Sequence, residues 1–239
     1  MYRFDIRGLY YPTQLYRSLN TLQDEVNKRV SFVYKYVTHV GKVYNFRPVQ
    51  PYILVARTNS VSDLAHRKAT EIVALMIKNM PSKVFIPLTR SNGVGLFSAP
   101  EGVTIYPENK QLADRPECYG RCSGQCAITC TFDGRKWSRV AGLTNSRAVC
   151  LDDIVLCNAR DPYGRKENIL SHEFAHLIMR YMPSTWSSKI SRAYRLAKSR
   201  RTWKLGTYAM ATEWEYWAEA SEAFFLNVLR TDVTGGMNM

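Results

Sequence analysis

Residues 169–179 read Ile-Leu-Ser-His-Glu-Phe-Ala-His-Leu-Ile-Met and predict a helix with an apolar side. His172 and His176 are four residues apart, so on a helix both imidazole rings project from one face and can bind one metal ion. Glu173 lies beside the first histidine, where its carboxylate can take a proton from water at the metal. Two neutral imidazoles and an open coordination position suit zinc, so this segment predicts a zinc site with a general base.

A helix that carries two surface histidines without a metal is the alternative interpretation. The chain has four histidines, and two of them fall in this short motif. The apolar neighbours that would pack such a helix against a core are Ile169, Phe174, Leu177 and Ile178. These neighbours favour the metal-binding interpretation.

A zinc site with two histidines needs a third ligand from the protein. No histidine follows His176, and Met179 stands where the metzincin motif H-E-x-x-H-x-x-G-x-x-H has its glycine, so that motif is excluded. The third ligand should therefore be a carboxylate. The predicted helix at residues 212–229 offers Glu213, Glu215, Glu219 and Glu222.

Three of these glutamates, Glu215, Glu219 and Glu222, are spaced four and three apart and share one helix face. Carboxylates stacked on so aromatic a helix repel one another unless a cation or hydrogen-bond donors contact them. The alternative interpretation is an acidic stripe that faces solvent. We expect Glu215 to bind the metal and Glu219 to accept the second ring N–H of a ligating histidine. The spacing alone leaves the reverse assignment open.

The motif H-E-F-A-H at residues 172–176 is followed by Tyr208, six further residues and Glu215-Tyr-Trp-Ala-Glu219. This arrangement resembles the gluzincin metallopeptidases, and most of all the zinc-peptidase domains typified by the catalytic domain of anthrax lethal factor. The resemblance covers residues 167–225, about a quarter of the chain, and implies a zincin-like metallopeptidase domain with one zinc ion. It also implies that Tyr208 donates a hydrogen bond in the transition state, that Glu215 is the third ligand and that Glu219 supports a histidine.

A zinc-dependent peptidase with Glu173 as general base is therefore the first functional hypothesis. An extended substrate would add to an exposed strand edge near the metal, and residues 83–89 and 94–97 are the candidates. The second hypothesis is a catalytically silent binding module that zinc stabilises and whose basic surface holds an acidic partner or glycan. The presence of Glu173 favours the peptidase, because binding zinc does not require a general base.

The periodicity along the chain predicts an α+β fold with a small mixed sheet, built as a single domain over residues 1–239. An α/β part at residues 1–157 includes an irregular excursion at residues 107–145, and a helical part at residues 158–239 holds the zinc site. Helices are expected at residues 13–37, 63–80, 167–182, 185–199 and 212–229. Strands are expected at residues 52–56, 83–89, 103–106 and 153–156, with turns at residues 91–102.

Six cysteines lie between residues 118 and 157, four of them at regular C-x3-C spacing: Cys118, Cys122, Cys126, Cys130, Cys150 and Cys157. Zinc-binding modules show paired knuckles instead, so the ladder predicts disulfides in an oxidising compartment and hence an extracellular or secreted protein. Six free thiols in the cytosol are the alternative. We expect Cys150 and Cys157 to pair with each other or with the ladder, although the spacing does not select a connectivity.

The chain of 239 residues is 46% apolar and 22% charged, as is ordinary for a globular protein, but its net charge is +13. Such an excess favours polyanionic partners, and the basic run at residues 189–204 is the candidate surface for an acidic glycan or another polyanion. The alternative is that this run borders the cleft and selects acidic substrate residues. No recognised nucleic-acid motif accompanies the charge, so specific nucleic-acid binding is not expected.

Two membrane-related features are absent from the sequence. No apolar run reaches the roughly 18 residues of a transmembrane helix, so no membrane span is expected. Residues 1–11 are mixed polar and aromatic and lack the apolar stretch of a signal peptide. If the protein is exported, we expect its leader to lie outside this chain.

Overall fold

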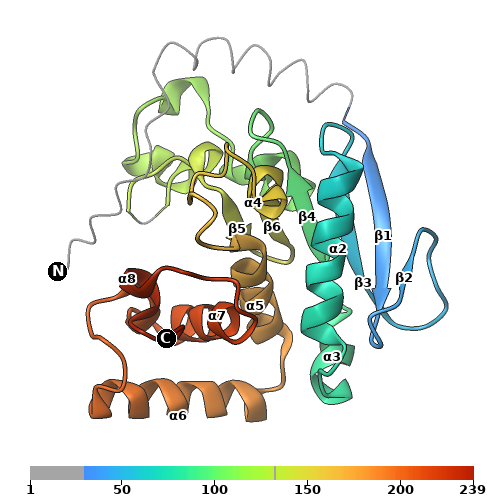
Figure 1. Ribbon diagram of the computed structural model, residues 1–239. Helices are drawn as coiled ribbons and strands as arrows, with labels where there is room; N and C mark the ends of the chain where they lie inside the picture. The colour runs from blue at the N-terminus through green and yellow to red at the C-terminus, as the bar shows by residue number, and fades with distance from the viewer. Residues whose placement is uncertain (1–29, 132) are drawn as a thin grey trace.

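A six-stranded sheet runs through the molecule, with its strands in the order β2-β1-β3-β4-β6-β5 (Figure 1). The computed structural model describes residues 30–131 and 133–239. Strands β3, β4 and β6 are parallel, whereas the other pairings are antiparallel, so the expected α+β class with a mixed sheet is confirmed. The strands are β1 (Phe32–Thr38), β2 (Val43–Tyr44), β3 (Tyr52–Thr58), β4 (Val94–Phe97), β5 (Gly142–Thr144) and β6 (Ala148–Leu151).

Helices α2 and α5 pack against each other and against the sheet, α2 over β1, β3 and β4 and α5 over β5 and β6. The side chain of Ser62 caps α2 by accepting a hydrogen bond from the backbone N–H of Ala65 at 3.2 Å, as its sequence position predicts. The helices are α2 (Asp63–Ile77), α3 (Ser82–Leu88), α4 (Asp152–Leu156), α5 (Ile169–Tyr181), α6 (Ser184–Arg200), α7 (Glu213–Phe224) and α8 (Thr231–Thr234).

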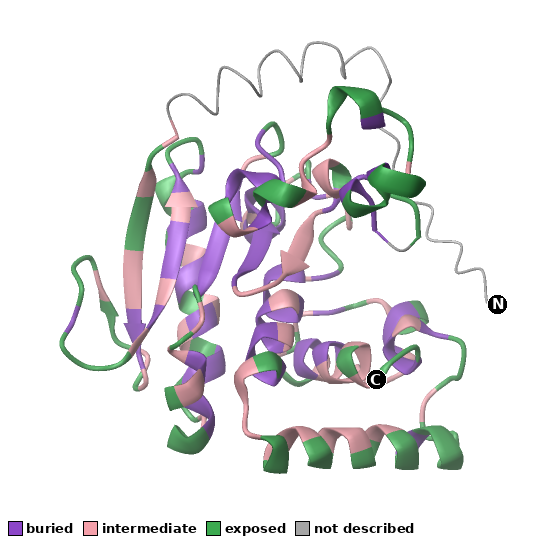
Figure 2. Ribbon diagram, turned by 180° about the vertical axis from the view of Figure 1, so that it is seen from behind, coloured by how far each residue is buried: buried purple, intermediate pink, exposed green. Residues whose placement is uncertain are grey.

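The three longer C-terminal helices confirm the expected helical part. Helix α7 contacts α5 on one side and α6 on the other, so α6 is the outermost of the three (Figure 1). Ala197 is the only residue of α6 that is buried, and the helix is drawn mostly exposed or half-buried in Figure 2. Within the described ranges, every helix falls short of the length and hydrophobicity that a bilayer crossing requires.

Three of the strand predictions are wrong, because the short apolar runs at these positions form helices or helical turns. Residues 83–89 lie mainly in α3, residues 103–105 form a 3-10 turn, and residues 153–156 lie in α4. Conversely, β4 lies within the expected turn at residues 91–102, and β5 lies within the expected irregular excursion at residues 107–145. A run of four to seven apolar residues suits a buried strand or a short helix equally well, and pairing partners distant in sequence decide between them.

The expected helix at residues 13–37 is also wrong at its end, because residues 32–38 form strand β1. Residues 13–29 of that expected helix lie outside the described residues. Strand β1 pairs with β3 over its whole length, from Phe32 opposite Thr58 to Thr38 opposite Tyr52. The β-branched and aromatic residues of Phe-Val-Tyr-Lys-Tyr-Val-Thr suit this extended, half-buried position better than a helix.

The cysteine ladder forms two disulfides, Cys118–Cys126 and Cys122–Cys130, in a region of 3-10 turns. The ammonium group of Lys136 is buried at the centre of this region. It donates to the carbonyls of Cys118 and Arg121 at 2.6 and 2.8 Å, to Thr129 Oγ1 at 2.7 Å and to Asp114 Oδ1 at 2.8 Å. Four acceptors around one cation offset the cost of its burial, so Lys136 stabilises the excursion together with the disulfides.

The expectation that Cys150 and Cys157 are disulfide-bonded is wrong. Cys150 is buried in β6, Cys157 is exposed at the end of α4, and both are free thiols. Burial raises the pKa of the Cys150 thiol well above its usual value. The two cysteines are held in different elements facing different surroundings, which sequence spacing cannot reveal.

We therefore expect one reactive thiol in the native, unreduced protein, that of Cys157, and two after denaturation. Titration with a thiol reagent before and after adding guanidinium chloride measures both numbers. Cys157→Ser should remove the native signal and leave one thiol after denaturation. A titre of zero or six in the denatured protein would contradict the pairing.

Candidate metal centre

Helices α5 and α7 run antiparallel and provide the side chains of the site. Trp217 Nε1, in the middle of α7, donates to the carbonyl of Ala175 in α5 at 2.8 Å. Both helices begin with a side-chain cap, Asn168 accepting from Ser171 N–H at 3.3 Å and Thr212 accepting from Glu215 N–H at 3.1 Å. Local capping and the packing between these helices therefore position the predicted residues.

The structure brings together the three residues expected to be ligands. His172 Nε2 lies 3.1 Å from His176 Nε2 and 3.1 Å from Glu215 Oε2, and His176 Nε2 lies 3.3 Å from the same oxygen. Two ring nitrogens and a carboxylate oxygen are donor types that zinc prefers. Ligands about 2.0–2.1 Å from a tetrahedral ion lie about 3.3–3.4 Å from one another, close to these separations. The residues present therefore fit zinc.

The other ring nitrogen of His172 faces two carboxylates. Its Nδ1 lies 3.2 Å from Glu219 Oε1 and 3.3 Å from Glu222 Oε2. The second oxygen of Glu222 accepts from the backbone N–H of Asn168 at 3.0 Å, so Glu222 ties the start of α5 to the ring. Glu219 was expected in this position, whereas a role for Glu222 was not, although it continues the same acidic face.

His172, Glu219 and Glu222 form a second group whose ligand atoms converge. It has one imidazole, and its glutamates are only 2% and 1% exposed. In the first group, by contrast, the side chains of Glu215 and His176 are 20% and 14% exposed. The first group is therefore the more open to solvent, so a metal that keeps a position for water fits there better, and Glu219 and Glu222 contact the other side of the His172 ring.

The electrostatics of the cluster follow from burial and from these contacts. Burial raises the pKa of Glu222 above its usual value, and the hydrogen bond from His172 opposes this shift. Burial opposes the charged form of Glu215 too, but hydrogen bonds from His172 and His176 outweigh it and hold the pKa of Glu215 well below its usual range. Glu215 is therefore a carboxylate at neutral pH, as a metal ligand must be.

Glu173 points to the edge of the sheet rather than to the other glutamates. Its Oε2 accepts a hydrogen bond from Thr144 Oγ1 at 2.7 Å, and the same hydroxyl lies 2.8 Å from its backbone carbonyl. Thr144 is the last residue of β5, a strand that the sequence pattern did not predict. A β-strand contact with Glu173 thus orients the expected general base.

Gly142, at the start of β5, makes room for this carboxylate. A Cβ atom at this position would lie 2.5 Å from Ile169 Cγ2, 2.9 Å from Glu173 Cγ and 3.0 Å from Glu173 Oε1. We expect Gly142→Ala to destabilise the protein by about 1–3 kcal/mol, because the added methyl group must displace Ile169 or Glu173. Thermal unfolding measures this effect, and an unchanged free energy of unfolding would contradict the close approach.

Tyr208 lies on the 3-10 turn Tyr208–Met210 and also reaches the site. Its ring stacks on that of His172, with centroids 6.0 Å apart and planes inclined by 25°. Burial raises the pKa of the Tyr208 hydroxyl far above its usual value, so it stays a hydrogen-bond donor at every physiological pH. The structure therefore places Tyr208 beside His172.

These residues line a pocket of about 520 Å³ that opens to solvent. Its apolar side chains come from the excursion, from β5 and from α5, α7 and α8: Trp137, Val140, Ala141, Leu143, Ile169, Trp214 and Val233. The basic run at residues 189–204 does not line this pocket, which removes the expectation that it borders the cleft. A pocket with apolar walls and a few convergent polar groups is typical of a substrate site.

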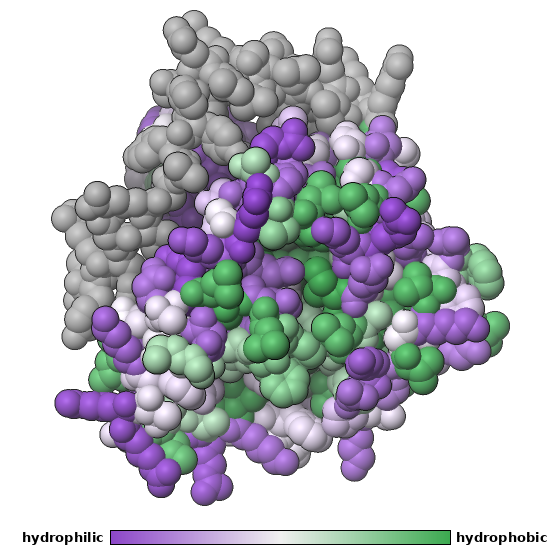
Figure 3. Space-filling view, viewed as in Figure 1, coloured by the Kyte–Doolittle hydropathy of each residue, from purple (hydrophilic) through white to green (hydrophobic). Residues whose placement is uncertain are grey.

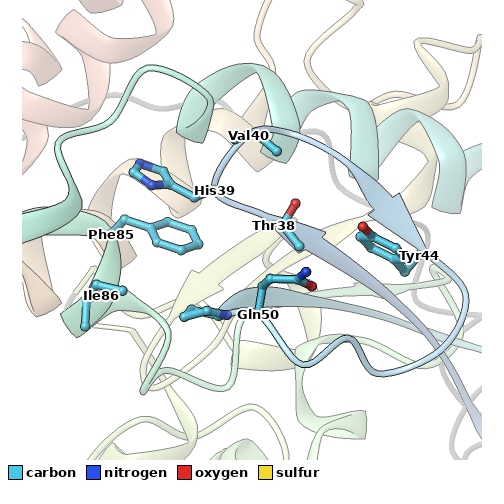
Figure 4. A pocket seen from close by; sticks show the side chains of 8 residues that line it. Thr38, His39, Val40, Tyr44, Gln50, Phe85 and Ile86 are labelled. Carbon is cyan, nitrogen blue, oxygen red and sulfur yellow. The ribbon is translucent and has the colours of Figure 1, made fainter.

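A second cavity, of about 280 Å³, lies at the far end of β1 beside α3 (Figure 4). The ring of His39 stacks on Phe85 there, with centroids 4.3 Å apart. His39 Nε2 already lies 2.5 Å from the carbonyl oxygen of Met80. This cavity has one imidazole and no carboxylate among its lining residues, so it does not compete as a metal site.

No model of a known protein family matches the chain, and a search of curated proteins finds no match either.

Proposed function

We propose that this chain is a zinc-dependent peptidase, in which His172, His176 and Glu215 hold the metal. The observation that carries the proposal is the convergence of three zinc-type donor atoms at an open pocket that Glu173 also lines. On this proposal, the chain belongs to the gluzincin metallopeptidases and has a zincin-like fold. Zinc, when bound, supplies Lewis acidity that polarises a carbonyl group and acidifies water.

The side chains around the pocket divide the remaining work. Glu173, oriented by Thr144, takes a proton from the attacking water and delivers it to the leaving amine. The hydroxyl group of Tyr208 donates a hydrogen bond to the oxyanion that develops on the scissile carbonyl. A well-placed donor of this kind stabilises the transition state by about 2.7–4 kcal/mol. Glu219 and Glu222 keep the ring of His172 oriented by holding its Nδ1–H.

Neither of the two segments expected to bind an extended substrate has a free strand edge. Residues 83–89 lie mainly in helix α3, and β4 (residues 94–97) lies between β3 and β6 inside the sheet, so neither presents a free strand edge. In the described ranges β5 pairs with β6 alone, and all three of its residues line the pocket. We propose that an extended peptide binds along β5, whose free backbone groups can form a further ladder.

The alternative is a catalytically silent module that zinc stabilises. A structural zinc site is usually closed by four protein ligands, whereas this group offers three and opens to a pocket. A binding module also has no need for a base held by Thr144 next to the metal. Both features favour the peptidase.

Metal analysis followed by digestion of a peptide library tests the proposed function. We expect about one zinc per chain and cleavage that stops when a chelator removes the metal and resumes when zinc is restored. A protein with one zinc that cleaves no peptide would support the silent module. A protein without zinc would contradict both.

We propose a second, separate role for α6, as a binding face for an acidic glycan. The cations of the run at residues 189–204 are all exposed and have no acidic partner in the described part of the chain: Lys189, Arg192, Arg195, Lys198, Arg200, Arg201 and Lys204. An unneutralised stripe of this kind attracts a polyanion. The two disulfides support an extracellular or secreted protein, where sulfated glycans occur.

Neutralising α6 should weaken binding to a sulfated glycan. We expect the triple variant Arg192→Gln, Arg195→Gln and Lys198→Gln to elute from heparin at clearly lower salt than the wild type. The variant has three fewer exposed positive charges, so less salt is needed to screen its attraction to the glycan. The matched control neutralises three exposed cations: Arg67 in α2, Lys78 at the C-cap of α2 and Lys83 in α3. Equal shifts for both triple variants, or equal retention on a plain cation exchanger, would contradict a specific face.

A further inference from the structure

Three arginines line the pocket that contains His172, His176 and Glu215, and two of them form ion pairs with carboxylates of the same chain. Arg135 Nε lies 2.9 Å from Asp133 Oδ2 on its own turn. Arg230 lies 2.7 Å from Asp232 and 3.3 Å from Glu167. The acidic lining residues are likewise engaged, since Glu173, Glu215 and Glu219 contact Thr144 or the histidines. The charge of the third arginine, Arg180, remains.

Arg180 is exposed, and its guanidinium group has no ion-pair or hydrogen-bond partner among residues 30–131 and 133–239. The sequence offers it none nearby, because no Asp or Glu occurs between Glu173 and Glu213. A cation that lines a substrate pocket and is left unpaired by its own chain is available to a ligand.

The position of Arg180 relative to the metal ligands follows from the helix geometry. It lies four residues after His176 on α5, and therefore on the same face, with a rise of about 6 Å along the axis. Since α5 and α7 are antiparallel, it lies toward the start of α7, where Trp214 stands 6.3 Å from the ring of His176. The Arg230 cluster lies toward the other end, because its partner Glu167 precedes α5.

We infer that Arg180 binds a carboxylate of the substrate and makes the enzyme select peptides with an acidic residue close to the scissile bond. This inference rests on the proposed peptidase function. An extended peptide advances about 3.3 Å per residue, so a rise of about 6 Å corresponds to roughly two residues from the metal. A planar guanidinium binds a carboxylate through two parallel hydrogen bonds, whereas an amide side chain cannot replace the charge.

The test compares peptides that differ at one position, carrying Glu, Gln or Lys at each of the two residues on either side of the cleaved bond. For the zinc-loaded full chain we expect kcat/KM to be about tenfold higher with Glu than with Gln at one position. Arg180→Gln should bring this ratio close to one, and Arg180→Glu should reverse the preference in favour of Lys. Arg67→Gln, which changes an exposed arginine of α2 outside the pocket, is the matched control and should keep the wild-type ratio.

The outcomes separate this inference from the proposed function. Cleavage by the wild type without a preference for Glu overturns the selectivity and leaves the peptidase intact. A preference that persists in Arg180→Gln, or an equal loss on all peptides with the ratio unchanged, also overturns it. Failure of the zinc-loaded wild type to cleave any peptide contradicts the proposed function itself, and the selectivity with it.

Discussion

Glu173→Gln should retain about one zinc per chain and lose about 10²–10⁴-fold in kcat/KM. The substitution keeps the size of the side chain and its contact with Thr144, but an amide cannot take a proton from water. Because Glu173 is not among the converging donor atoms, metal content should not change. Elemental analysis and a peptide-cleavage assay on the same sample measure the two quantities.

The matched control is Glu71→Gln, which removes an exposed carboxylate from α2, away from the pocket. It should match the wild type in both measurements. If Glu173→Gln cleaves as fast as the wild type, Glu173 is not the base; if it loses zinc, the carboxylate belongs to the coordination group instead.

Glu215→Gln should weaken zinc binding by more than about 100-fold, because it removes a charged donor atom from the metal. Glu219→Gln and Glu222→Gln should each cost less, on the order of 10–100-fold, since both act through the Nδ1 of His172. Competition with a chelator of known zinc affinity gives all three values. Circular dichroism before and after metal removal shows whether each variant is folded.

The order of these three effects shows which of the two candidate ligand groups holds the metal. If Glu219→Gln strips the metal and Glu215→Gln leaves it bound, the ion lies in the buried group instead, and the roles of ligand and support are reversed. Equal, small effects from all three variants would contradict a metal at either place.

The helices of the site could be predicted because their signal is local. Histidines at a spacing of four and glutamates at spacings of four and three mark one face of a helix, whatever the rest of the chain does. The antiparallel packing of α5 and α7 then brings Glu215 to the Nε2 side of His172 and Glu219 to its Nδ1 side. Spacing alone left that order open, and the geometry favours Glu215 as the ligand.

Strand β5 could not be predicted, and with it the surroundings of Glu173 were missed. The strand has three residues and pairs with β6 across a short turn, so it carries no periodicity of its own. Gly142 and Thr144 matter only because α5 crosses that strand, which is a contact between residues about thirty apart in sequence. The presence of a glycine and a threonine within an irregular stretch was the only signal available.

Glu222 was missed for a different reason. It was recognised as part of the acidic face, but its position one helical turn beyond Glu219 suggested no partner. Its role follows from the start of α5, where the backbone N–H of Asn168 and the ring of His172 lie within reach of the same carboxyl group. The first N–H groups of a helix require acceptors, and here a buried glutamate is one of them.

X-ray diffraction from crystals of the zinc-loaded protein, measured on both sides of the zinc absorption edge, tests the central claim most directly. The account predicts one anomalous peak per chain, bounded by Nε2 of His172, Nε2 of His176 and the carboxylate of Glu215. The absence of a peak, or a peak enclosed by His172, Glu219 and Glu222 instead, would contradict it.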